Sequence, residues 1–479
     1  MKRVVIIGGG ISGLSTAFSL REHQGKDADF EVVILEKKDR AGGNIRTERA
    51  DGFTIEGGPD CFLSEKPWAM ELCKRIGLEG SLMPTNDEHR KTFVLSKGKL
   101  HELPEGVILM VPTRIAPLAY SSLISIPGKL RMAMEFFVPK RKEKGDESLG
   151  DFVRRRLGKE ALDKIAEPLV AGVHAGDPET MSVRASFPKF VQLEEEYGSL
   201  IKGMLKRMEL LKKTRKSSTD KPAKKVTMFM TLKGGLTEMI DTLIQRLSGF
   251  KNTVIKTDVT VKAVIKRDGG YEVLIDGGPS IEADAVILTA PAHAASNLLK
   301  DVDAALSEKL LTIPYVSTAT VSLGFKRKDV THPLNGFGFV VPKTEGRRIM
   351  AATWTSVKFS HRAPEDSVLI RCFVGGSKNA GLVDLPDAEI AKIAREELKE
   401  LMGIDALPVV TRVYKWVRSM PQYTIGHEER VKWIEERTAS HPGLYLTGSA
   451  YYGIGISDSI RSGEVTAKKA LHYLSGKTS

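Results

Sequence analysis

A glycine-rich turn beside the N-terminus is the strongest constraint on the fold of this 479-residue chain. The β-branched run Arg3–Ile7 predicts a strand buried on both faces of a parallel sheet, and Leu14–Leu20 has a helical pattern. Between them the glycines have G-x-G-x-x-G spacing, which gives a tight turn, room for a pyrophosphate and close helix–strand packing. We therefore predict a dinucleotide site at the helix N-terminus. Its residues are Gly8, Gly9, Gly10, Ile11, Ser12 and Gly13.

A second predicted strand ends in an acidic residue. The strand covers Glu31–Leu35 and is followed by Glu36, roughly 20 residues after the glycine turn, where an acid in such folds binds a ribose hydroxyl. We assign Glu36, with its neighbour Lys37, to the adenosine end of the dinucleotide.

Two glycine pairs downstream decide which dinucleotide is expected. They lie in RAGGNIRT (Arg40–Thr47) and EGGPD (Glu56–Asp60), and paired glycines suit backbone that lies against a ligand where a Cβ would clash. The first segment resembles the R-x-G-G-R-x-x-T segment of flavin amine oxidases, although Asn44 stands where an arginine is usual. This resemblance favours FAD over NAD. The contacts expected here are Gly42, Gly43, Asn44, Gly57, Gly58, Pro59 and Asp60.

The C-terminal segment is the third candidate part of the cofactor site. A strand over Gly443–Thr447, the stretch GSAYYGIGISD and a helix over Ser459–Leu474 follow one another. Most relatives have an acid after the first glycine of this stretch, and Ser449 replaces it here. The helix N-terminus can stabilise negative charge on a reduced flavin. The expected contacts are Gly448, Gly453, Ile454, Gly455 and Ile456, with Trp416 a further candidate.

An antiparallel meander is predicted over Thr253–Ile281, because the residues alternate in period two around two glycine pairs. Val259 would lie in its first strand and hold the adenine by backbone contacts.

Charge and cysteine content narrow the class of protein. The net charge of +12 suggests an anionic partner, either an acidic substrate or a membrane surface, and no nucleic-acid reader motif is present. Cys61, Cys73 and Cys372 form no C-x-x-C pair, which argues against a disulfide framework, a dithiol centre or a metal site. The N-terminus runs directly into a strand and no apolar stretch is long enough to span a membrane. We therefore expect a cytoplasmic protein.

Two basic stretches were open to more than one interpretation. Residues 107–139 are apolar, interrupted by prolines and cations, which suits an interfacial element, a pocket wall or an ordinary helical core. Lys202–Lys225 is strongly basic and is predicted to be a mobile loop between domains, with a solvated basic face as the alternative.

The pattern of elements predicts an α/β (α+β) fold with three parts. A Rossmann-like FAD-binding domain is expected from residues 1–67, 229–292 and 408–479. A substrate-binding domain with an antiparallel sheet is expected from residues 68–100, 167–228 and 293–407. A helical subdomain, a candidate for membrane association, is expected from residues 101–166.

Nearly the whole chain resembles oxygen-dependent protoporphyrinogen oxidases, most closely the soluble bacterial branch that acts on coproporphyrinogen III. Of the shared motifs, MPQYTIGH discriminates best, because general amine oxidases lack it. The motifs are GGGISGL (Gly8–Leu14), EGGPDCF (Glu56–Phe62), EPLVAGVHAGD (Glu167–Asp177), MPQYTIGH (Met420–His427) and GIGISDSI (Gly453–Ile460).

The resemblance implies FAD, aromatisation of a porphyrinogen by loss of six electrons to three O2, and a role in haem biosynthesis. It also implies peripheral contact with the inner face of the membrane and hand-over to the next haem-synthesis enzyme. The residues agree, because a single dinucleotide motif and unpaired cysteines leave O2 as the simple oxidant. We assign no residue as acid or base, since a lone histidine such as His174 is more often structural. Lys66 is the candidate partner for a substrate carboxylate.

Other functions remain open at this point. Protoporphyrinogen IX is the alternative substrate. An amine oxidase would need an aromatic cage and a carotenoid desaturase a more apolar tunnel. A flavin-binding haem carrier without catalytic activity is the alternative from another class.

Overall fold

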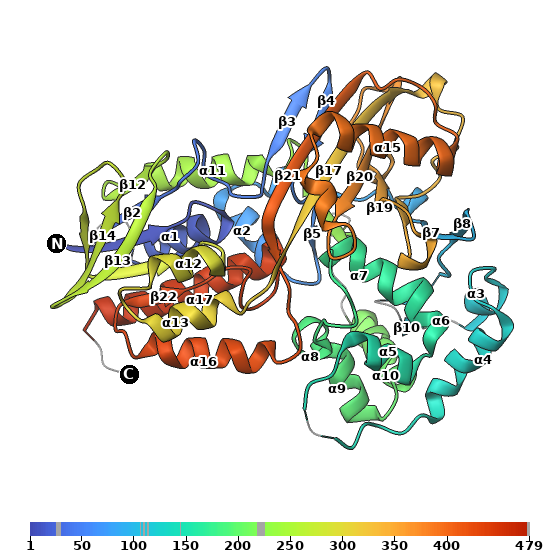
Figure 1. Ribbon diagram of the computed structural model, residues 1–479, viewed down its shortest axis with the longest axis horizontal. Coiled ribbons are helices and arrows are strands. Elements are labelled where there is room, and N and C mark those ends of the chain that lie inside the picture. The colour runs from blue at the N-terminus through green and yellow to red at the C-terminus, as the bar shows by residue number, and fades with distance from the viewer. Residues whose placement is uncertain are drawn as a thin grey trace.

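The computed structural model shows two large sheets, several smaller ones and a group of helices (Figure 1). The parallel sheet with its helices lies on the left of the view, a large, mostly antiparallel sheet at upper right, and the helical part at lower right. The residues that the structure describes are 1–24, 30–105, 107–108, 111–112, 115–143, 145–217 and 226–476.

Five parallel strands form the sheet that carries the glycine turn, in the order β12-β2-β1-β16-β22. β1 is central, and its alternating side chains are buried on both faces, Val4 and Ile6 on one and Val5 and Ile7 on the other. Helices α1, α11 and α17 share the first core, while the meander and α12 and α13 share the second. The elements are β1 (Lys2–Ile7), β2 (Phe30–Leu35), β12 (Thr253–Lys256), β16 (Ala285–Leu288), β22 (Leu444–Leu446), α1 (Ile11–Gln24), α11 (Thr237–Ser248), α12 (Ala292–Leu298), α13 (Ala304–Leu311), α16 (His427–Ala439) and α17 (Ile456–Leu474).

The meander begins later than predicted. β13 (Val261–Arg267), β14 (Gly270–Ile275) and β15 (Ile281–Ala283) are antiparallel, whereas Thr253–Lys256 pairs parallel with β2. Val259 is therefore not in a meander strand but in the connection before β13. Period-two alternation is the same in parallel and antiparallel strands, so the sequence could not distinguish the two sheets.

Seven strands form the second sheet, in the order β21-β17-β20-β19-β18-β7-β8, with α15 packed on one face. β7 and β8 form an antiparallel hairpin around Gly98. β21 pairs with β17, so residues 410–421 lie in this sheet although the predicted boundaries grouped them with the FAD-binding domain. The elements are β7 (Thr92–Ser96), β8 (Lys99–Glu102), β17 (Tyr315–Lys326), β18 (Gly338–Val340), β19 (Ile349–Trp354), β20 (Ser367–Gly375), β21 (Val410–Pro421), α14 (Thr355–Lys358) and α15 (Asp387–Met402).

The helical part has its own core, in which Phe152 and Phe190 stack at 6.3 Å. The segment predicted as a mobile basic loop is helical as far as Ser217. The helix starts at the buried Leu200 and packs Met204 against the same core, and residues 218–225 lie outside the described part of the chain. The elements are α3 (Ile115–Tyr120), α4 (Ile126–Ala133), η3 (Met134–Phe137), α5 (Leu149–Arg156), α6 (Lys159–Ala161), the π-helix η4 (Leu162–Ala166), α7 (Glu167–His174), α8 (Val183–Ser186), α9 (Pro188–Tyr197) and α10 (Leu200–Ser217).

Short elements connect these parts. Within the described residues, no helix is both long and apolar enough to cross a membrane. The remaining elements are β3 (Thr47–Ala50), β4 (Phe53–Glu56), β5 (Phe62–Leu63), α2 (Trp68–Ile76), η1 (Glu79–Ser81), β6 (Leu82–Pro84), η2 (Asp87–His89), β9 (Val107–Ile108), β10 (Val111–Pro112), β11 (Phe229–Leu232), η5 (Arg327–Asp329), η6 (Lys343–Glu345) and η7 (Ala380–Asp384).

Candidate active site

The glycine turn has the geometry of a diphosphate cradle. A Cβ on Gly8 would lie 2.5 Å from Thr289 Oγ1, and a Cβ on Gly13 would overlap the Gly8 carbonyl oxygen, so protein packing itself requires both glycines. Gly10 differs, because among the described residues beyond its chain neighbours only Gly43 Cα, at 3.8 Å, lies within 4 Å of its Cβ position. Among the described residues, the N–H groups of Ser12 and Gly13 find no acceptor. Open space beside Gly10 and free amides at the start of α1 suit an anionic ligand.

Glu36 is fixed beside this cradle. Its buried carboxylate accepts hydrogen bonds from the Gly9 N–H (2.8 Å) and the Lys38 N–H (2.9 Å), which leaves lone pairs for ribose hydroxyls. The Val259 N–H donates to the Glu36 carbonyl at 3.0 Å, so only the Val259 carbonyl is available to an adenine. The Lys37 side chain is exposed.

The first glycine loop packs on the cradle, and the second glycine loop packs on the first. The Gly42 N–H donates to the Gly9 carbonyl (2.7 Å), and a Cβ on Gly43 would lie 3.1 Å from Gly10 Cα. A Cβ on Gly58 would overlap the Asn44 carbonyl, so the second loop lies directly against the first. The cradle, residues 42–44 and residues 57–58 therefore form a continuous backbone surface.

Side chains from the seven-stranded sheet hold the second loop. The Gly57 carbonyl accepts hydrogen bonds from Trp416 Nε1 and Thr320 Oγ1, each at 2.8 Å, and a Cβ on Gly57 would lie 2.9 Å from the Tyr414 ring. Trp416, predicted from sequence as a cofactor contact, thus positions the loop by bonding its backbone.

Asp60 has a partner that sequence reasoning missed. Its carboxylate lies 3.0 Å from Lys358 Nζ and accepts a hydrogen bond from the Cys61 thiol at 3.0 Å. Burial alone would raise the pKa of Asp60, but the charges of Lys358 and Arg371 outweigh burial and hold it well below its usual range. Burial and the Asp60 charge raise the pKa of Cys61 to about 12, so the thiol is neutral. No local sequence signal links Lys358 to Asp60.

The C-terminal segment completes the cradle. A Cβ on Gly448 would lie 3.5 Å from Ser12 Oγ, which places this residue against the first turn of α1. Helix α17 begins at Ile456 with Gly455 as its N-cap and no side-chain cap. Its N-terminal amides can therefore stabilise negative charge on a ligand that reaches it.

Lys66 forms an ion pair with a residue in the first turn of α17. Its Nζ lies 2.8 and 2.6 Å from the two carboxylate oxygens of Asp458, and Ser457 Oγ donates to its carbonyl at 3.0 Å. The side chain of Lys66 is 42% exposed, so a carboxylate from solution can still reach it.

Burial and the nearby Lys66 charge lower the pKa of His174 to about 4, which keeps that imidazole neutral at physiological pH.

The MPQYTIGH motif ties three parts of the molecule together. Gln422 Nε2 donates to the carbonyl of His174 at the end of α7 (3.1 Å), and Tyr423 OH donates to the Ser449 carbonyl (2.8 Å). The ring of His427 stacks on Tyr423 at 3.9 Å and lies 3.1 Å from the carbonyl of Tyr451. The motif therefore positions the C-terminal cofactor segment relative to α7.

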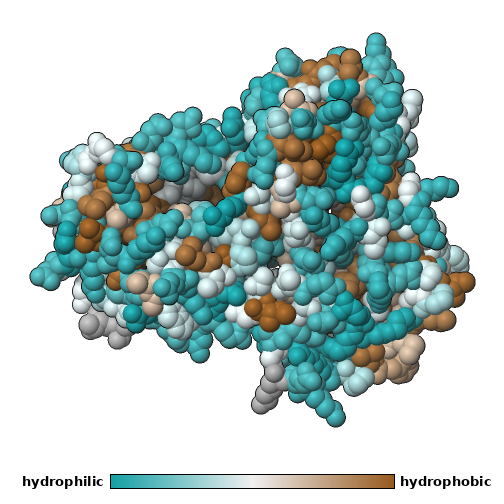
Figure 2. Space-filling model, viewed as in Figure 1, coloured by the Kyte–Doolittle hydropathy of each residue, from teal (hydrophilic) through white to brown (hydrophobic). Residues whose placement is uncertain are grey.

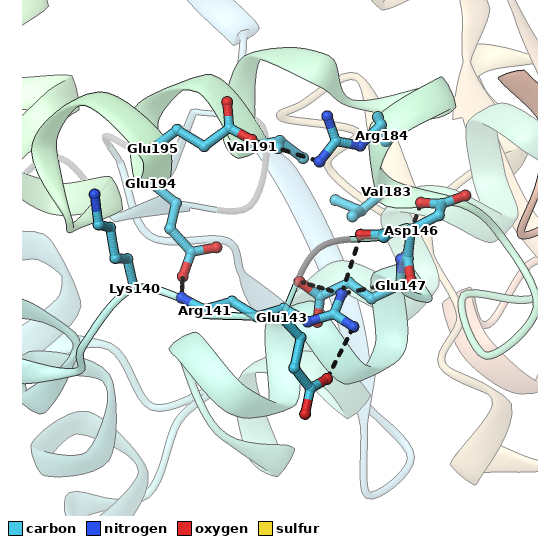
Figure 3. A pocket seen from close by; sticks show the side chains of 11 residues that line it. Lys140, Arg141, Glu143, Asp146, Glu147, Val183, Arg184, Val191, Glu194 and Glu195 are labelled. Carbon is cyan, nitrogen blue, oxygen red and sulfur yellow. Dashed lines mark hydrogen bonds and ion pairs between the residues drawn. The ribbon is translucent and has the colours of Figure 1, made fainter.

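A polar pocket in the helical part is a separate feature (Figure 3). Its volume is about 150 Å³, below the 300–1,000 Å³ of typical ligand pockets. Its charges pair with one another: Arg141 with Glu143 at 3.2 Å, and Arg184 with Glu195 at 3.4 Å. This pocket is not a candidate for the main ligand.

The fold and the glycine cradle define a dinucleotide-binding oxidoreductase with a second, antiparallel-sheet domain. The family described as flavin containing amine oxidoreductase matches residues 11–471, and the chain belongs to this family. Its cofactor is FAD, which fits the open space beside Gly10, the fixed carboxylate of Glu36 and the uncapped start of α17.

Individual relatives narrow the class further. The chain is 39% identical to coproporphyrinogen III oxidase of Bacillus subtilis (strain 168), over 99% of this chain and 98% of that one. It is 30% identical to the chloroplastic protoporphyrinogen oxidase of Oryza sativa subsp. japonica, over 98% and 88% of the two chains. A crystal structure of a provisionally assigned protoporphyrinogen oxidase from Exiguobacterium sp. 255-15 superimposes with a TM-score of 0.85 at 32% identity, covering 99% of both chains.

Proposed function

We propose that the chain oxidises coproporphyrinogen III to coproporphyrin III in haem biosynthesis. Six hydrogen atoms leave the substrate and reduce three O2 to three H2O2. The observation that carries the proposal is the end-to-end similarity to a coproporphyrinogen III oxidase, joined to a complete flavin cradle. The formal charge of +12 suits a substrate with four carboxylates.

The protein's own contribution is placement. FAD supplies the redox chemistry by accepting a hydride from the macrocycle and passing electrons to O2. The cradle at residues 8–13 would hold the diphosphate, Glu36 would hold the ribose, and residues 42–44 and 57–60 would border the flavin. No side chain is assigned as acid or base, because fixing the reactants in contact is the main requirement for hydride transfer.

Protoporphyrinogen IX is the second candidate substrate, favoured by the plant relative and by the Exiguobacterium structure. Parallel turnover of both porphyrinogens, followed by porphyrin fluorescence, distinguishes them. We expect a higher kcat/KM for the tetra-acid and a preference that shrinks as salt rises, because screening weakens exposed charge pairs. Equal kcat/KM at every salt concentration would refute the preference.

Lys66 offers a direct test of carboxylate recognition. Lys66→Ala should raise KM by about two- to fivefold and leave kcat unchanged, since a partly exposed ion pair contributes at most about 1 kcal/mol. Asp458→Asn should lower KM, because it frees Lys66 from its partner at 2.6 Å. Lys189→Ala, which removes a surface lysine paired with Glu65, is the matched control. A lost kcat with unchanged KM in Lys66→Ala would contradict this role.

The helical part is the proposed site of peripheral contact with the inner face of the membrane, in a protein that is otherwise cytoplasmic. Large apolar side chains are exposed along α3, α4 and η3, and apolar atoms gather over this edge in Figure 2. Lys202 lies 4.2 Å from the Phe136 ring, so cations border the apolar side chains. We call this surface the apolar rim: Tyr120 (90% exposed), Ile126 (73%), Leu130 (64%), Met134 (58%) and Phe137 (82%).

Binding to anionic vesicles tests the apolar rim. The double variant Leu130→Ser/Phe137→Ser should weaken partitioning at least tenfold, because each side chain contributes roughly 1.5–3 kcal/mol when buried. Leu407→Ser, at a residue 74% exposed and distant in sequence, is the control and should change nothing. High salt should release part of the bound wild type. Unchanged binding of the double variant would exclude the apolar rim as the membrane-contact surface.

A further inference from the structure

A group of buried charges lies behind the loop that borders the proposed flavin position. Its members are Glu56 (2% exposed), Arg362 (1%), Arg371 (3%), Lys358 (9%) and the side chain of Asp60 (14%). We call this group the buried charge cluster. Burying charges is costly unless they are paired, so the pairing within the cluster is informative.

Two cations in the cluster have carboxylate partners and one does not. Lys358 lies 3.0 Å from Asp60, and Arg362 lies 3.1 Å from Glu56. Arg371 forms no ion pair with any described residue; its Nη2 donates to the Gly58 carbonyl, and its Nε has no partner. Three cations against two carboxylates leave an excess positive charge.

Neighbouring groups do not cancel this excess. Burial outweighs the attraction of Arg362 and raises the pKa of Glu56, and even with both carboxylates ionised the three cations exceed them by one charge. The Cys61 thiol is neutral and so adds no charge. On the other side of the site, the positive charge of Lys66 is balanced by the negative charge of Asp458 in their ion pair.

The cluster is attached to the flavin-facing backbone. Arg371 bonds the Gly58 carbonyl, and Asp60 is two residues further along the same loop. Gly58 packs on Asn44, and Gly43 packs on Gly10 in the diphosphate cradle. A flavin extending from the cradle along this backbone surface therefore has the cluster directly behind the loop.

We propose that the excess positive charge of the buried charge cluster stabilises the negative charge that FAD gains on reduction and so sets its midpoint potential. Fixed charges act strongly in such a site because the surrounding dielectric is low and nothing needs to reorganise. Lys358 and Arg371 are then positioning residues: they hold the loop in place, and the electric field of their charges acts on the flavin through that loop. The inference rests on FAD binding but not on the identity of the substrate.

Midpoint potentials of the FAD-loaded protein, measured anaerobically against a reference dye without substrate, test this inference. Lys358→Gln should lower the ratio of reduced to oxidised flavin about tenfold at fixed potential, about 30 mV for a two-electron couple. Asp60→Asn should shift the ratio by a similar factor in the opposite direction. The double variant Lys358→Gln/Asp60→Asn should lie near the wild type, because its net charge is unchanged.

A purely structural role gives a different pattern, in which both single variants shift the potential the same way or not at all. Either result overturns the proposal. If Lys358→Gln does not retain FAD, Arg371→Lys and Arg371→Gln decide instead: the first keeps the wild-type ratio and the second lowers it about tenfold. Equal potentials for these two variants would overturn it as well. Lys326→Gln, which breaks an exposed pair with Asp366, is the control and should leave the potential unchanged.

Discussion

Gly10→Val is expected to abolish FAD binding while the protein remains folded. In the part of the chain that the structure describes, the nearest atom to a Cβ at Gly10, its chain neighbours apart, is Gly43 Cα at 3.8 Å. Gly10 does not have a positive φ, so the substitution adds little strain to the protein alone. The branched side chain instead fills the space that the pyrophosphate needs. We expect the affinity for FAD to fall at least a hundredfold, about 2.7 kcal/mol, measured by titrating FAD into apoprotein.

A neighbouring glycine provides the matched contrast. Gly13→Ala puts a Cβ onto the Gly8 carbonyl oxygen, so this variant should lower the melting temperature even in the apoprotein, whereas Gly10→Val should not. Retained yellow colour in Gly10→Val after gel filtration would contradict our placement of the diphosphate. A melting temperature lowered equally in both variants would show that Gly10 serves packing instead.

Glu135→Ala is expected to destabilise the helical part by about 3–5 kcal/mol, because it removes the fully buried partner of Arg156 and leaves that cation only Glu194, 3.3 Å away. Glu135 and Arg156 are both fully buried, and Arg156 Nε donates to Glu135 at 2.9 Å. The same carboxylate accepts hydrogen bonds from Ser199 Oγ (2.7 Å) and the Leu200 N–H (2.8 Å), so it also caps α10. Loss of hydrogen-exchange protection in α10 and a lower urea midpoint should both appear.

Two further variants check the cause of this loss. Glu102→Ala removes an exposed partner of Lys91 and should change stability by at most about 1 kcal/mol. Glu135→Leu/Arg156→Met removes both buried charges and should recover much of the loss, since apolar residues of similar volume can replace a buried pair. A loss below about 1 kcal/mol in Glu135→Ala, the level of an exposed pair, would show that this pair is not critical.

Local patterns predicted the elements that carry the cofactor site. The glycine turn lies between β1 and α1, as its spacing requires. The sequence pattern is a strong signal at the glycine turn because strand, turn and helix follow one another within a few residues.

The errors and omissions have physical reasons. Thr253–Lys256 was assigned to the wrong sheet because parallel and antiparallel strands share one period. Basic residues in 200–217 concealed the apolar positions that pack in the helical core. Asp60 and Lys358 are 298 residues apart, and Lys66 and Asp458 are 392 apart, so no local pattern could reveal either pair. Long-range ion pairs of this kind depend on the tertiary fold.

Anaerobic mixing of the FAD-loaded protein with coproporphyrinogen III tests the central claim most directly. We expect the visible absorbance of the oxidised flavin to bleach without O2. On admission of O2 the colour should return, with coproporphyrin fluorescence and three H2O2 for each porphyrin formed. Flavin that stays oxidised in the presence of excess porphyrinogen, with no porphyrin above the uncatalysed background, would contradict the claim and favour a flavin-binding haem carrier.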